Sequence, residues 1–330
     1  MANTREPVDE PLIKSEPHTS GVEQVMKKTP PKNLPDAMLK GLRPKQWVKN
    51  VLVLAAPLAA GADAFNSRTA VDILLAFVVF CFGASSIYLI NDARDVESDR
   101  LHPTKRFRPI ASGMLPINLA YAMAAVLIAA ALGLSLLATD GASLAWVIGI
   151  YIALQLGYCF GWKHIPVIDI ALVSSGFMLR AMAGGVAADI ELSQWFLLVA
   201  AFGSLFMASG KRYAELLLAE RTGAKIRKSL QGYTQTYLRF VWTLSATAVV
   251  MSYALWGFTL SDGVAPAEGL WYQISMVPFI IASLRYAAEV DSGNGGAPDE
   301  IALEDRVLQR LALLWIFTIV MAVYIVPAIS

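Results

Sequence analysis

The chain has 330 residues, of which 56% are hydrophobic and 16% charged, and its formal net charge at pH 7 is +1. Soluble domains carry about 45–50% apolar and about 25% charged residues, so this composition indicates a membrane protein. The near-neutral charge gives no reason to expect a nucleic-acid partner. The two cysteines, Cys81 and Cys159, lie in apolar runs, which excludes a disulfide framework.

The N-terminal segment, residues 1–37, is rich in Pro, Lys, Glu, Thr and Ser and contains no apolar run. Such a composition cannot bury enough apolar surface to order itself, and it lacks the apolar region of a signal peptide. We therefore expect a disordered cytosolic tail, followed by a single domain over residues 38–330.

The junction after the tail reads Arg-Pro-Lys-Gln-Trp-Val-Lys-Asn at residues 43–50. Trp47 is typical of an anchor at the membrane interface. Lys45 and Lys49 are four residues apart, so on an α-helix both face the mouth of a bundle and are candidate substrate-binding residues. Attraction to lipid headgroups is the alternative explanation for these lysines.

Nine stretches are apolar enough, and long or nearly long enough, to cross a membrane, which takes roughly 20 apolar residues. The predicted fold class is therefore all-α, a polytopic membrane protein with a bundle of nine transmembrane helices. Pro278 lies inside the eighth stretch and is expected to bend it. The predicted spans are 48–64, 70–90, 116–138, 143–162, 166–187, 193–210, 237–259, 269–287 and 307–328.

The positions of Lys and Arg set the orientation, because these residues concentrate on the cytosolic side of membrane proteins. With the N-terminus inside, all but two of the 27 Lys and Arg residues lie in the tail or in or beside the loops that follow even-numbered spans. The exceptions are Arg68, in an outer loop, and Arg180, within the fifth span. We expect a multi-pass protein of the plasma (inner) membrane with a cytoplasmic N-terminus.

The first polar motif leaves the second span as Asn91-Asp92-x-x-Asp95-x-x-x-Asp99. On a continuous helix, Asn91, Asp95 and Asp99 share one face. Clustered oxygen ligands without His or Cys suit Mg²⁺, which takes one or two carboxylates together with phosphate oxygens and water. These four residues are the candidate metal ligands, and Asp92 and Asp95 are also candidate catalytic residues. The alternative, a solvated helix end, leaves Asp95 and Asp99 as a destabilising like-charge pair.

Basic residues follow this motif within ten positions. Lys105, Arg106 and Arg108 are candidate substrate-binding residues, because a metal-bound diphosphate needs cations and bidentate donors on its oxygens. Tyr88 lies one turn before Asp92 and is expected to contact the substrate at the edge of a cavity.

Two loops in the middle of the chain add candidate substrate contacts. Tyr158 lies near the end of the fourth span, and Lys163 is the only Lys or Arg of the short loop after it, with headgroup attraction as the alternative. Arg180 lies 14 residues past Pro166, about 21 Å along a helix. At that depth it either pairs within the bundle or extends to the far interface. The shallower Asp169 is expected to pair with a cytosolic base.

The segment after the sixth span begins Ala-Ser-Gly-Lys-Arg-Tyr-Ala-Glu at residues 208–215. Lys211 and Arg212 lie three to four residues before Glu215, so the three side chains share a helical face. We expect Lys211 and Arg212 to form a phosphate clamp and count both as candidate catalytic residues, with Glu215 as a candidate substrate contact. An ordinary basic flank with an intrahelical salt bridge is the alternative.

The Asn-Asp-x-x-Asp-x-x-x-Asp motif after a second span, in a frame of nine spans, resembles the UbiA superfamily of intramembrane prenyltransferases over residues 38–330. The resemblance implies a nine-helix bundle with a cytosolic polar cap, a lipid-open cavity, a cytoplasmic active site and Mg²⁺ as cofactor. Typical members carry a second Asp-rich DxxxD motif after the sixth span. This chain has Lys211, Arg212 and Glu215 there instead.

That departure, together with the sequences at 43–50 and 91–95, resembles an actinobacterial branch of the family with reversed substrate roles. The resemblance implies a polyprenyl (decaprenyl) phosphate lipid as acceptor and the water-soluble 5-phosphoribosyl 1-diphosphate (PRPP) as donor. The acidic motif then binds Mg²⁺ and the diphosphate, basic residues bind the remaining phosphates, and the product supplies arabinan synthesis in the cell wall.

Two other functions stay open at this point. A conventional aromatic or quinone prenyltransferase would use a prenyl diphosphate, and the missing second acidic motif argues against it. A lipid transporter or flippase would have ionisable residues near the midplane, whereas those of this chain cluster at the cytosolic mouth. A homo-oligomer, with a trimer as the working expectation, is compatible with the sequence, although no motif requires one.

Overall fold

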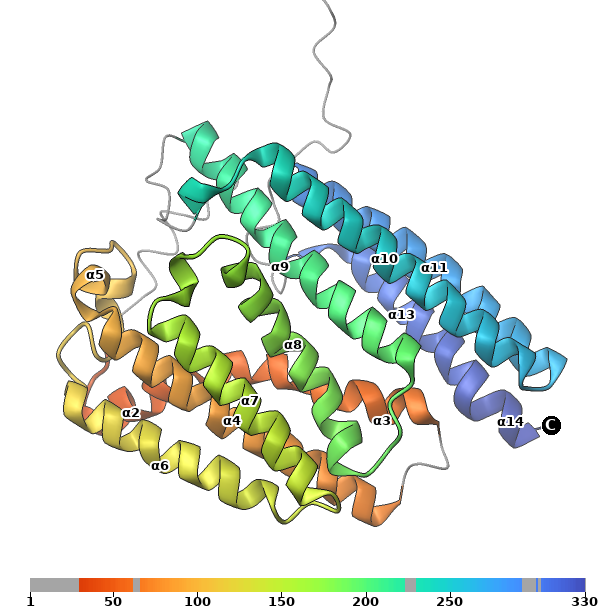
Figure 1. Cartoon of the computed structure of the whole chain (residues 1–330), viewed down its shortest axis with the longest axis horizontal. Coiled ribbons are helices and arrows are strands. Elements are labelled where there is room, and N and C mark those ends of the chain that lie inside the picture. The colour runs from red at the N-terminus through yellow and green to blue at the C-terminus, as the bar shows by residue number, and fades with distance from the viewer. Residues whose placement is uncertain (1–29, 62–65, 223–229, 293–300, 302–303, 330) are drawn as a thin grey trace, which may run out of the picture.

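A computed structural model describes residues 30–61, 66–222, 230–292, 301 and 304–329, and all regular elements in these ranges are helical (Figure 1). The first part of the chain contains α2 (Leu34–Leu42), η1 (Pro44–Leu54), α3 (Ala55–Ala60), α4 (Ser67–Arg94), α5 (Val96–Arg100), η3 (Lys105–Phe107) and α6 (Ile117–Ser135). The second part contains α7 (Gly141–Cys159), η4 (Trp162–His164), α8 (Ile168–Ala187), α9 (Gln194–Thr222), η5 (Leu230–Gly232), α10 (Gln235–Asp262), α11 (Pro266–Asp291), α13 (Arg306–Val320), the π-helical turn η6 (Met321–Ile325) and α14 (Val326–Ile329).

Helix α2 begins inside the segment for which disorder was predicted. The side chain of Asn33 caps it by accepting a hydrogen bond from the Asp36 backbone N–H, and Pro35 lies in the first turn, where its missing N–H is no loss. Lys40 pairs with Asp36 at 2.8 Å, one turn away. The first described helix therefore begins four residues before the predicted boundary at residue 38, and residues 1–29 of the predicted tail lie outside the described residues.

Six helices of the described chain are long and apolar enough to cross a membrane. They correspond to the predicted second, third, fourth, fifth, seventh and ninth spans. The predicted sixth and eighth spans form the long helices α9 and α11, and Pro278 lies within α11 as expected. The six candidates are Ser67–Arg94, Ile117–Ser135, Gly141–Cys159, Ile168–Ala187, Gln235–Asp262 and Arg306–Ile329.

The predicted first span is not one continuous α-helix. Residues 44–54 form the 3₁₀-helix η1, and only the six residues of α3 follow it as α-helix. A 3₁₀-helix rises about 2.0 Å per residue and repeats every 3.0 residues, so side chains three apart eclipse each other. This changes which residues share a face and therefore affects the candidate site.

Two large hydrophobic clusters of the described residues correspond to the two halves of the sequence, and a third, small cluster joins α11 to η6. One core forms where α4 packs against α6, α7 and α8, and the other where α9 packs against α8, α10 and α11. Helix α8 lies between the halves, and α5 projects from one end of the bundle (Figure 1). The polar side chains that follow α4 gather at this end.

Arg180 of α8 links η1 and α7 deep in the bundle. Its side chain is 6% exposed and donates to the Asn50 Oδ1 of η1 at 2.7 Å, to the Gly176 carbonyl at 2.7 Å and to the Tyr151 hydroxyl at 2.9 Å. The pairing predicted for Arg180 is confirmed, and the alternative that it extends to the far interface is not what the structure has.

Candidate active site

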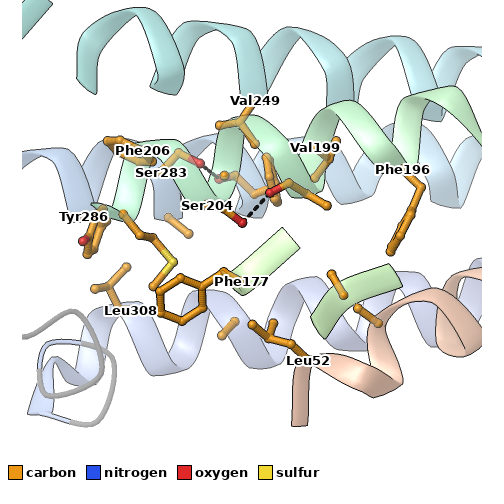
Figure 2. A pocket seen from close by; sticks show the side chains of 18 of the residues that line it. Leu52, Phe177, Phe196, Val199, Ser204, Phe206, Val249, Ser283, Tyr286 and Leu308 are labelled. Atoms are coloured by element: carbon orange, nitrogen blue, oxygen red, sulfur yellow. Dashed lines mark hydrogen bonds between the residues drawn. The ribbon is translucent and has the colours of Figure 1, made fainter. Parts of the chain in front are cut away.

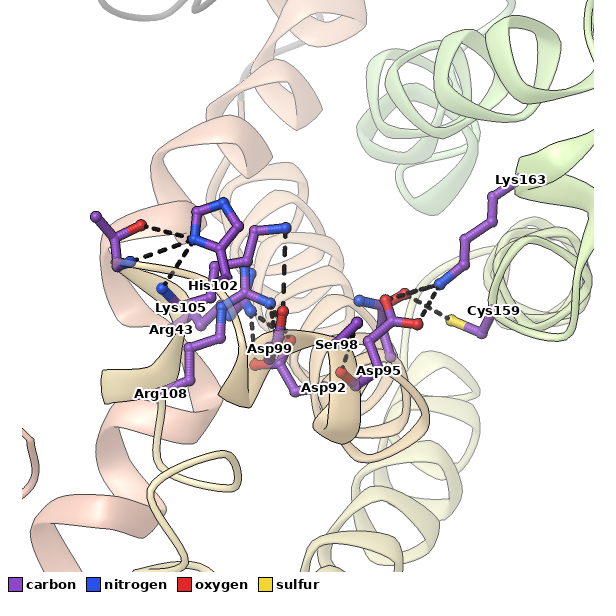
Figure 3. Close-up of polar contacts among 12 residues, drawn as sticks. Arg43, Asp92, Asp95, Ser98, Asp99, His102, Lys105, Arg108, Cys159 and Lys163 are labelled. Carbon is purple, nitrogen blue, oxygen red and sulfur yellow. Dashed lines mark hydrogen bonds and ion pairs between the residues drawn. The ribbon is translucent and has the colours of Figure 1, made fainter. Parts of the chain in front are cut away.

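The carboxylate of Asp92, near the end of α4, is held by two arginines (Figure 3). Arg43 donates from one terminal nitrogen to both oxygens of Asp92 at 2.6 Å, and Arg108 donates to Oδ1 at 3.0 Å. The backbone of Arg43 has a φ of 54°, a left-handed conformation that costs a non-glycine residue of order 1–3 kcal/mol. The contact with Asp92 helps hold this conformation between α2 and η1.

The helix that carries the acidic motif breaks at Asp95, which separates the four predicted ligands into two pairs. Asp95 ends α4 and precedes α5, so the prediction that Asn91, Asp95 and Asp99 share one face is wrong. Asp99 turns instead toward Asp92, and Arg108 bridges the two with distances of 2.6 and 3.0 Å. The Lys105 Nζ lies 4.0 Å from Asp99.

The second pair faces the loop between α7 and α8. The Nζ of Lys163 lies 2.6 and 2.7 Å from the oxygens of Asp95 and 3.3 Å from the Oδ1 of Asn91. Figure 3 shows this contact on the opposite side of the α4 end from Arg43 and Arg108. The predicted candidates Asn91, Asp95 and Lys163 therefore come together in the fold, although 68 or more residues separate Lys163 from the other two.

The donor set fits Mg²⁺. Each pair of oxygen-bearing side chains already converges on one cationic nitrogen, that of Lys163 or that of Arg108. Mg²⁺ is bound by one or two carboxylates, with substrate phosphates and water completing its octahedron. Among the described residues no three His, Cys, Asp or Glu side chains form a metal site by themselves. Such a site would therefore be completed by the phosphates of a substrate.

Arg212 of α9 is buried among carboxylates. Its Nε donates to Asp169 at 2.9 Å and its NH1 to Glu215 at 3.0 Å, and the side chains of Arg212 and Asp169 are 6% and 0% exposed. This contact confirms the base predicted for Asp169. The Tyr233 hydroxyl also donates to Asp169 at 2.6 Å, and burial and this bond raise the pKa of Tyr233. Lys211, the neighbour of Arg212 in α9, is by contrast only half-buried.

The two lysines of η1 do not share a face. A 3₁₀-helix turns 120° per residue, so four residues leave Lys45 and Lys49 about 120° apart. Lys45 is exposed and Lys49 is half-buried. The prediction that both face the mouth of the bundle, which assumed an α-helix, is therefore wrong for the pair.

The remaining predicted contacts lie around the same end. Tyr88 is covered by Arg43, whose guanidinium carbon is 4.9 Å from the ring centroid. Tyr158 is half-buried and lies near enough to Arg212 to contribute to the raised pKa of that guanidinium. Arg106 is exposed and stacks over its neighbour Phe107, with its guanidinium carbon 4.9 Å from the ring centroid.

An apolar cavity of about 770 Å³ lies between the two halves of the bundle (Figure 2). Its size falls within the range of about 300–1,000 Å³ typical of ligand pockets. Its wall comes from η1, α3, α8, α9, α10, α11 and α13, and includes Leu52, Phe177, Met207, Phe279 and Leu313.

Three residues with contacts at or near the site were not among the site residues predicted from the sequence. Arg43 was noted only as part of the 43–50 motif, and Asn50 and Tyr233 were not singled out as site residues. The partner of Arg43 lies 49 residues away and that of Tyr233 64 residues away, so no local spacing indicates either pair. The one available signal was Arg180, an intramembrane charge that requires a polar partner.

The sequence and fold match known proteins over most of their length. A family model described as the UbiA prenyltransferase family matches residues 50–303. The chain is 78% identical over 317 residues to the decaprenyl-phosphate phosphoribosyltransferase of Corynebacterium glutamicum, covering 96% of this chain and 95% of that protein. It is 61% identical over 303 residues to the protein of the same name from Mycolicibacterium smegmatis, covering 89% and 95%.

Among solved structures, a UbiA homolog from Archaeoglobus fulgidus bound to GPP and Mg²⁺ superimposes with a TM-score of 0.64 at 17% identity, covering 88% of this chain and 99% of that one. At this identity the likeness concerns the fold alone. Together with the family match, it establishes that the chain belongs to the UbiA prenyltransferase family.

Proposed function

We propose that this chain transfers the 5-phosphoribosyl group of PRPP to a polyprenyl phosphate, decaprenyl phosphate by likeness to its relatives, with release of pyrophosphate. The product would be a precursor for the arabinan of the cell wall. The observation that carries the proposal is the 78% identity, over nearly the whole chain, to a decaprenyl-phosphate phosphoribosyltransferase. The charge arrangement of the site agrees with it.

The proposal places the acidic motif at the cytosolic face of the plasma membrane. PRPP is water-soluble and enters from the cytosol, while the acceptor lies in the bilayer. In addition to the six candidate spans, the long helices α9 and α11 would cross the membrane, and η1 with α3 would form the ninth, irregular span. Backbone without α-helical bonding is tolerated at membrane depth where it is packed within protein. The predicted homo-oligomer stays a prediction.

In the proposed reaction, the acidic motif and its neighbouring bases bind the donor. Asn91, Asp92, Asp95 and Asp99 would hold Mg²⁺, which when bound neutralises charge on the leaving diphosphate. Arg43, Arg108 and Lys163 already lie among these carboxylates and are placed to exchange them for diphosphate oxygens.

The acceptor end needs no general base. A phosphate monoester is anionic at neutral pH, so one of its oxygens can attack C1 of the ribose directly. The bond from C1 to the diphosphate oxygen breaks, and pyrophosphate carries the electron pair away. The cations around the acidic motif stabilise the charge that develops on this leaving group.

The basic segment of α9 supports a phosphorylated lipid over a second diphosphate. The single carboxylate there, Glu215, is already paired with Arg212 at 3.0 Å, and Asp169 takes the other side of the same guanidinium. Neither acid is free to hold a second metal, as a conventional prenyl-diphosphate user would require. Lys211 is placed to attract an anionic headgroup instead.

The test is to supply the purified protein, in lipid nanodiscs, with Mg²⁺, PRPP and a polyprenyl phosphate. We expect pyrophosphate and a phosphoribosyl lipid, measured by mass spectrometry, to appear in equal amounts and to vanish with EDTA. Product from a prenyl diphosphate and an aromatic acceptor, but none from PRPP, would overturn the proposal in favour of a conventional prenyltransferase. Lipid movement across liposomes without any covalent product would overturn it in favour of a transporter.

A further inference from the structure

The helix η1 contains 11 residues, although 3₁₀-helices longer than three to four residues are uncommon and often mark functional segments. Its repeat of three gives it three distinct faces. The face of Trp47, Asn50 and Val53 packs into the bundle: Asn50 and Val53 are 1% and 0% exposed, and Trp47 donates to Ser85 at 3.1 Å. The side chains on this face fix how the helix is rotated about its axis.

A second face of η1 leads into the apolar cavity. Leu52, and Ala55 just after the helix, both line the cavity (Figure 2 labels Leu52). Lys49 precedes Leu52 by one 3₁₀ turn, about 6 Å along the axis, and is eclipsed with it. On an α-helix, residues three apart would be offset by about 60° around the axis. The 3₁₀ geometry therefore puts Lys49 on the cavity stripe, directly before its first apolar residue.

Lys211 occupies the matching position on the facing wall. Met207 of α9 lines the cavity, and Lys211 follows it by four residues, one α-helical turn or about 6 Å. The neighbouring Arg212 contacts Asp169 at the start of α8, which places this turn at the same end of the bundle as the acidic motif. A lysine from each half of the bundle thus lies one turn beyond a cavity-lining residue, toward the end of the bundle that carries the acidic motif.

The rotation of η1 is locked by contacts on both sides of Lys49. At its start, Arg43 is held by Asp92 at 2.6 Å. The buried Asn50 accepts from Arg180 at 2.7 Å and donates to the Sγ of Cys81 at 3.2 Å. A side chain at Gly184 of α8 would collide with the backbone carbonyl of η1 residue 53, so the two helices are in close contact there.

We propose that Lys49 binds the phosphate of the acceptor lipid at the mouth of the apolar cavity, opposite Lys211, and that the hydrogen bond from Arg180 to Asn50 is the positioning contact that aims it. This inference rests on the proposed function and adds the place of the acceptor. The lipid tail occupies the cavity, and its headgroup meets two ammonium groups at the rim, on the side of the donor site. Lysine binds phosphate as a point charge, which suits a headgroup that must stay free to attack.

The first test compares Lys49→Met with Lys40→Met, a matched loss of one lysine on the surface of α2, where Lys40 pairs with Asp36 at 2.8 Å. Hydrogen bonds to charged groups are worth about 1.5–3 kcal/mol, so we expect Lys49→Met to raise the KM for polyprenyl phosphate about 10- to 100-fold and to leave the KM for PRPP unchanged. Lys40→Met should behave as the wild type.

A binding measurement without PRPP completes this test. In the wild type, polyprenyl phosphate should raise the Tm more than the uncharged polyprenol does, and Lys49→Met should remove that difference. If wild-type turnover is normal and Lys49→Met keeps both the acceptor KM and the Tm difference, the inference is overturned while the proposed function stands. If the wild type makes no phosphoribosyl lipid, the proposed function itself fails.

The second test concerns the positioning contact. Asn50→Ala removes the acceptor of the Arg180 bond, whereas Asn50→Asp keeps an oxygen in its place. We expect Asn50→Ala to raise the KM for polyprenyl phosphate with little change in kcat or in the KM for PRPP, and Asn50→Asp to restore the acceptor KM. Equal losses in kcat and both KM values, in Asn50→Asp as well, would reduce Asn50 to a structural residue and overturn the positioning role.

Discussion

Lys163 contacts both Asn91 and Asp95, where the metal-bound diphosphate would bind in the proposed reaction, so its removal should affect the binding of metal and of PRPP in opposite directions. Its Nζ lies within 3.3 Å of Asn91 and within 2.7 Å of both oxygens of Asp95, and its side chain is 13% exposed. In Lys163→Gln a free divalent cation no longer competes with an ammonium for these oxygens. We therefore expect the metal to bind more tightly in the absence of donor.

The size of this effect follows from the contacts that are lost. Hydrogen bonds to charged groups contribute about 1.5–3 kcal/mol, and because the side chain of Asp95 is 31% exposed, solvent screening reduces this to about 1–2 kcal/mol. The metal affinity should then rise about 5- to 30-fold. With PRPP present we expect the opposite change, a lower metal affinity in Lys163→Gln, because the variant lacks a cation for the diphosphate oxygens.

Titration with Mn²⁺ followed by electron paramagnetic resonance measures both affinities, with the protein in nanodiscs and with or without PRPP. Lys40→Gln, which removes a lysine whose side chain pairs with Asp36 rather than with the acidic motif, controls for the change in net charge. If Lys163→Gln binds free Mn²⁺ no more tightly than the wild type does, Lys163 does not compete with the metal and the reasoning is refuted.

Three further predictions concern other contacts. Asp92→Asn should lower Mg²⁺-dependent pyrophosphate release about 100-fold or more, and full turnover would remove Asp92 from the metal site. Arg212→Met leaves Asp169 buried without its cation and should destabilise the fold by about 3–5 kcal/mol, seen as a lower Tm; an unchanged Tm with a raised acceptor KM would make Arg212 a substrate contact instead. Burial opposes ionisation of Asp305, but hydrogen bonds from Arg285 and two backbone N–H groups lower its pKa overall. Its stabilising effect is therefore fully present above about pH 4 and lost as the pH falls through the folded pKa, so Asp305→Asn, which keeps the helix cap, should cost about 1 kcal/mol at pH 7 and less at pH 3. An equal loss at both pH values would contradict this.

The fold class and the first motif were predictable because both are local signals. Hydropathy over a window of 20 residues marks a helix whatever surrounds it, and the residues from Asn91 to Asp99 follow one such window directly. Their partners were harder to predict, since Arg43 and Lys163 reach the motif from 49 and 68 residues away in sequence. Lys163 was identified by its isolation in a short loop, whereas Arg43 had no comparable signal.

The first span shows why helix periodicity fails where the backbone is not α-helical. Hydropathy identifies residues 48–64 as apolar but does not distinguish a repeat of 3.0 residues from one of 3.6. Only the contacts of Asn50 with Arg180 and Cys81 reveal which face is buried. Because those partners are distant in sequence, the separation of Lys45 from Lys49 could not be predicted from the spacing.

The basic segment of α9 is best understood through its charge balance. Arg212 meets two carboxylates, those of Asp169 and Glu215, so together these three side chains carry no excess positive charge. Their formal charges sum to −1, and Lys211, one turn beyond the cavity-lining Met207, brings this helical turn to neutrality while its own ammonium is not taken up by Asp169 or Glu215 in the contacts above. In the proposed reaction, a lysine ammonium from each half of the bundle attracts a phosphate, and carboxylates already paired with Arg212 are poor ligands for a second divalent cation. The proposed reaction would thus have a metal-binding donor site at the acidic motif and a separate, metal-free acceptor site beside α9, as phosphoribosyl transfer to a lipid phosphate requires.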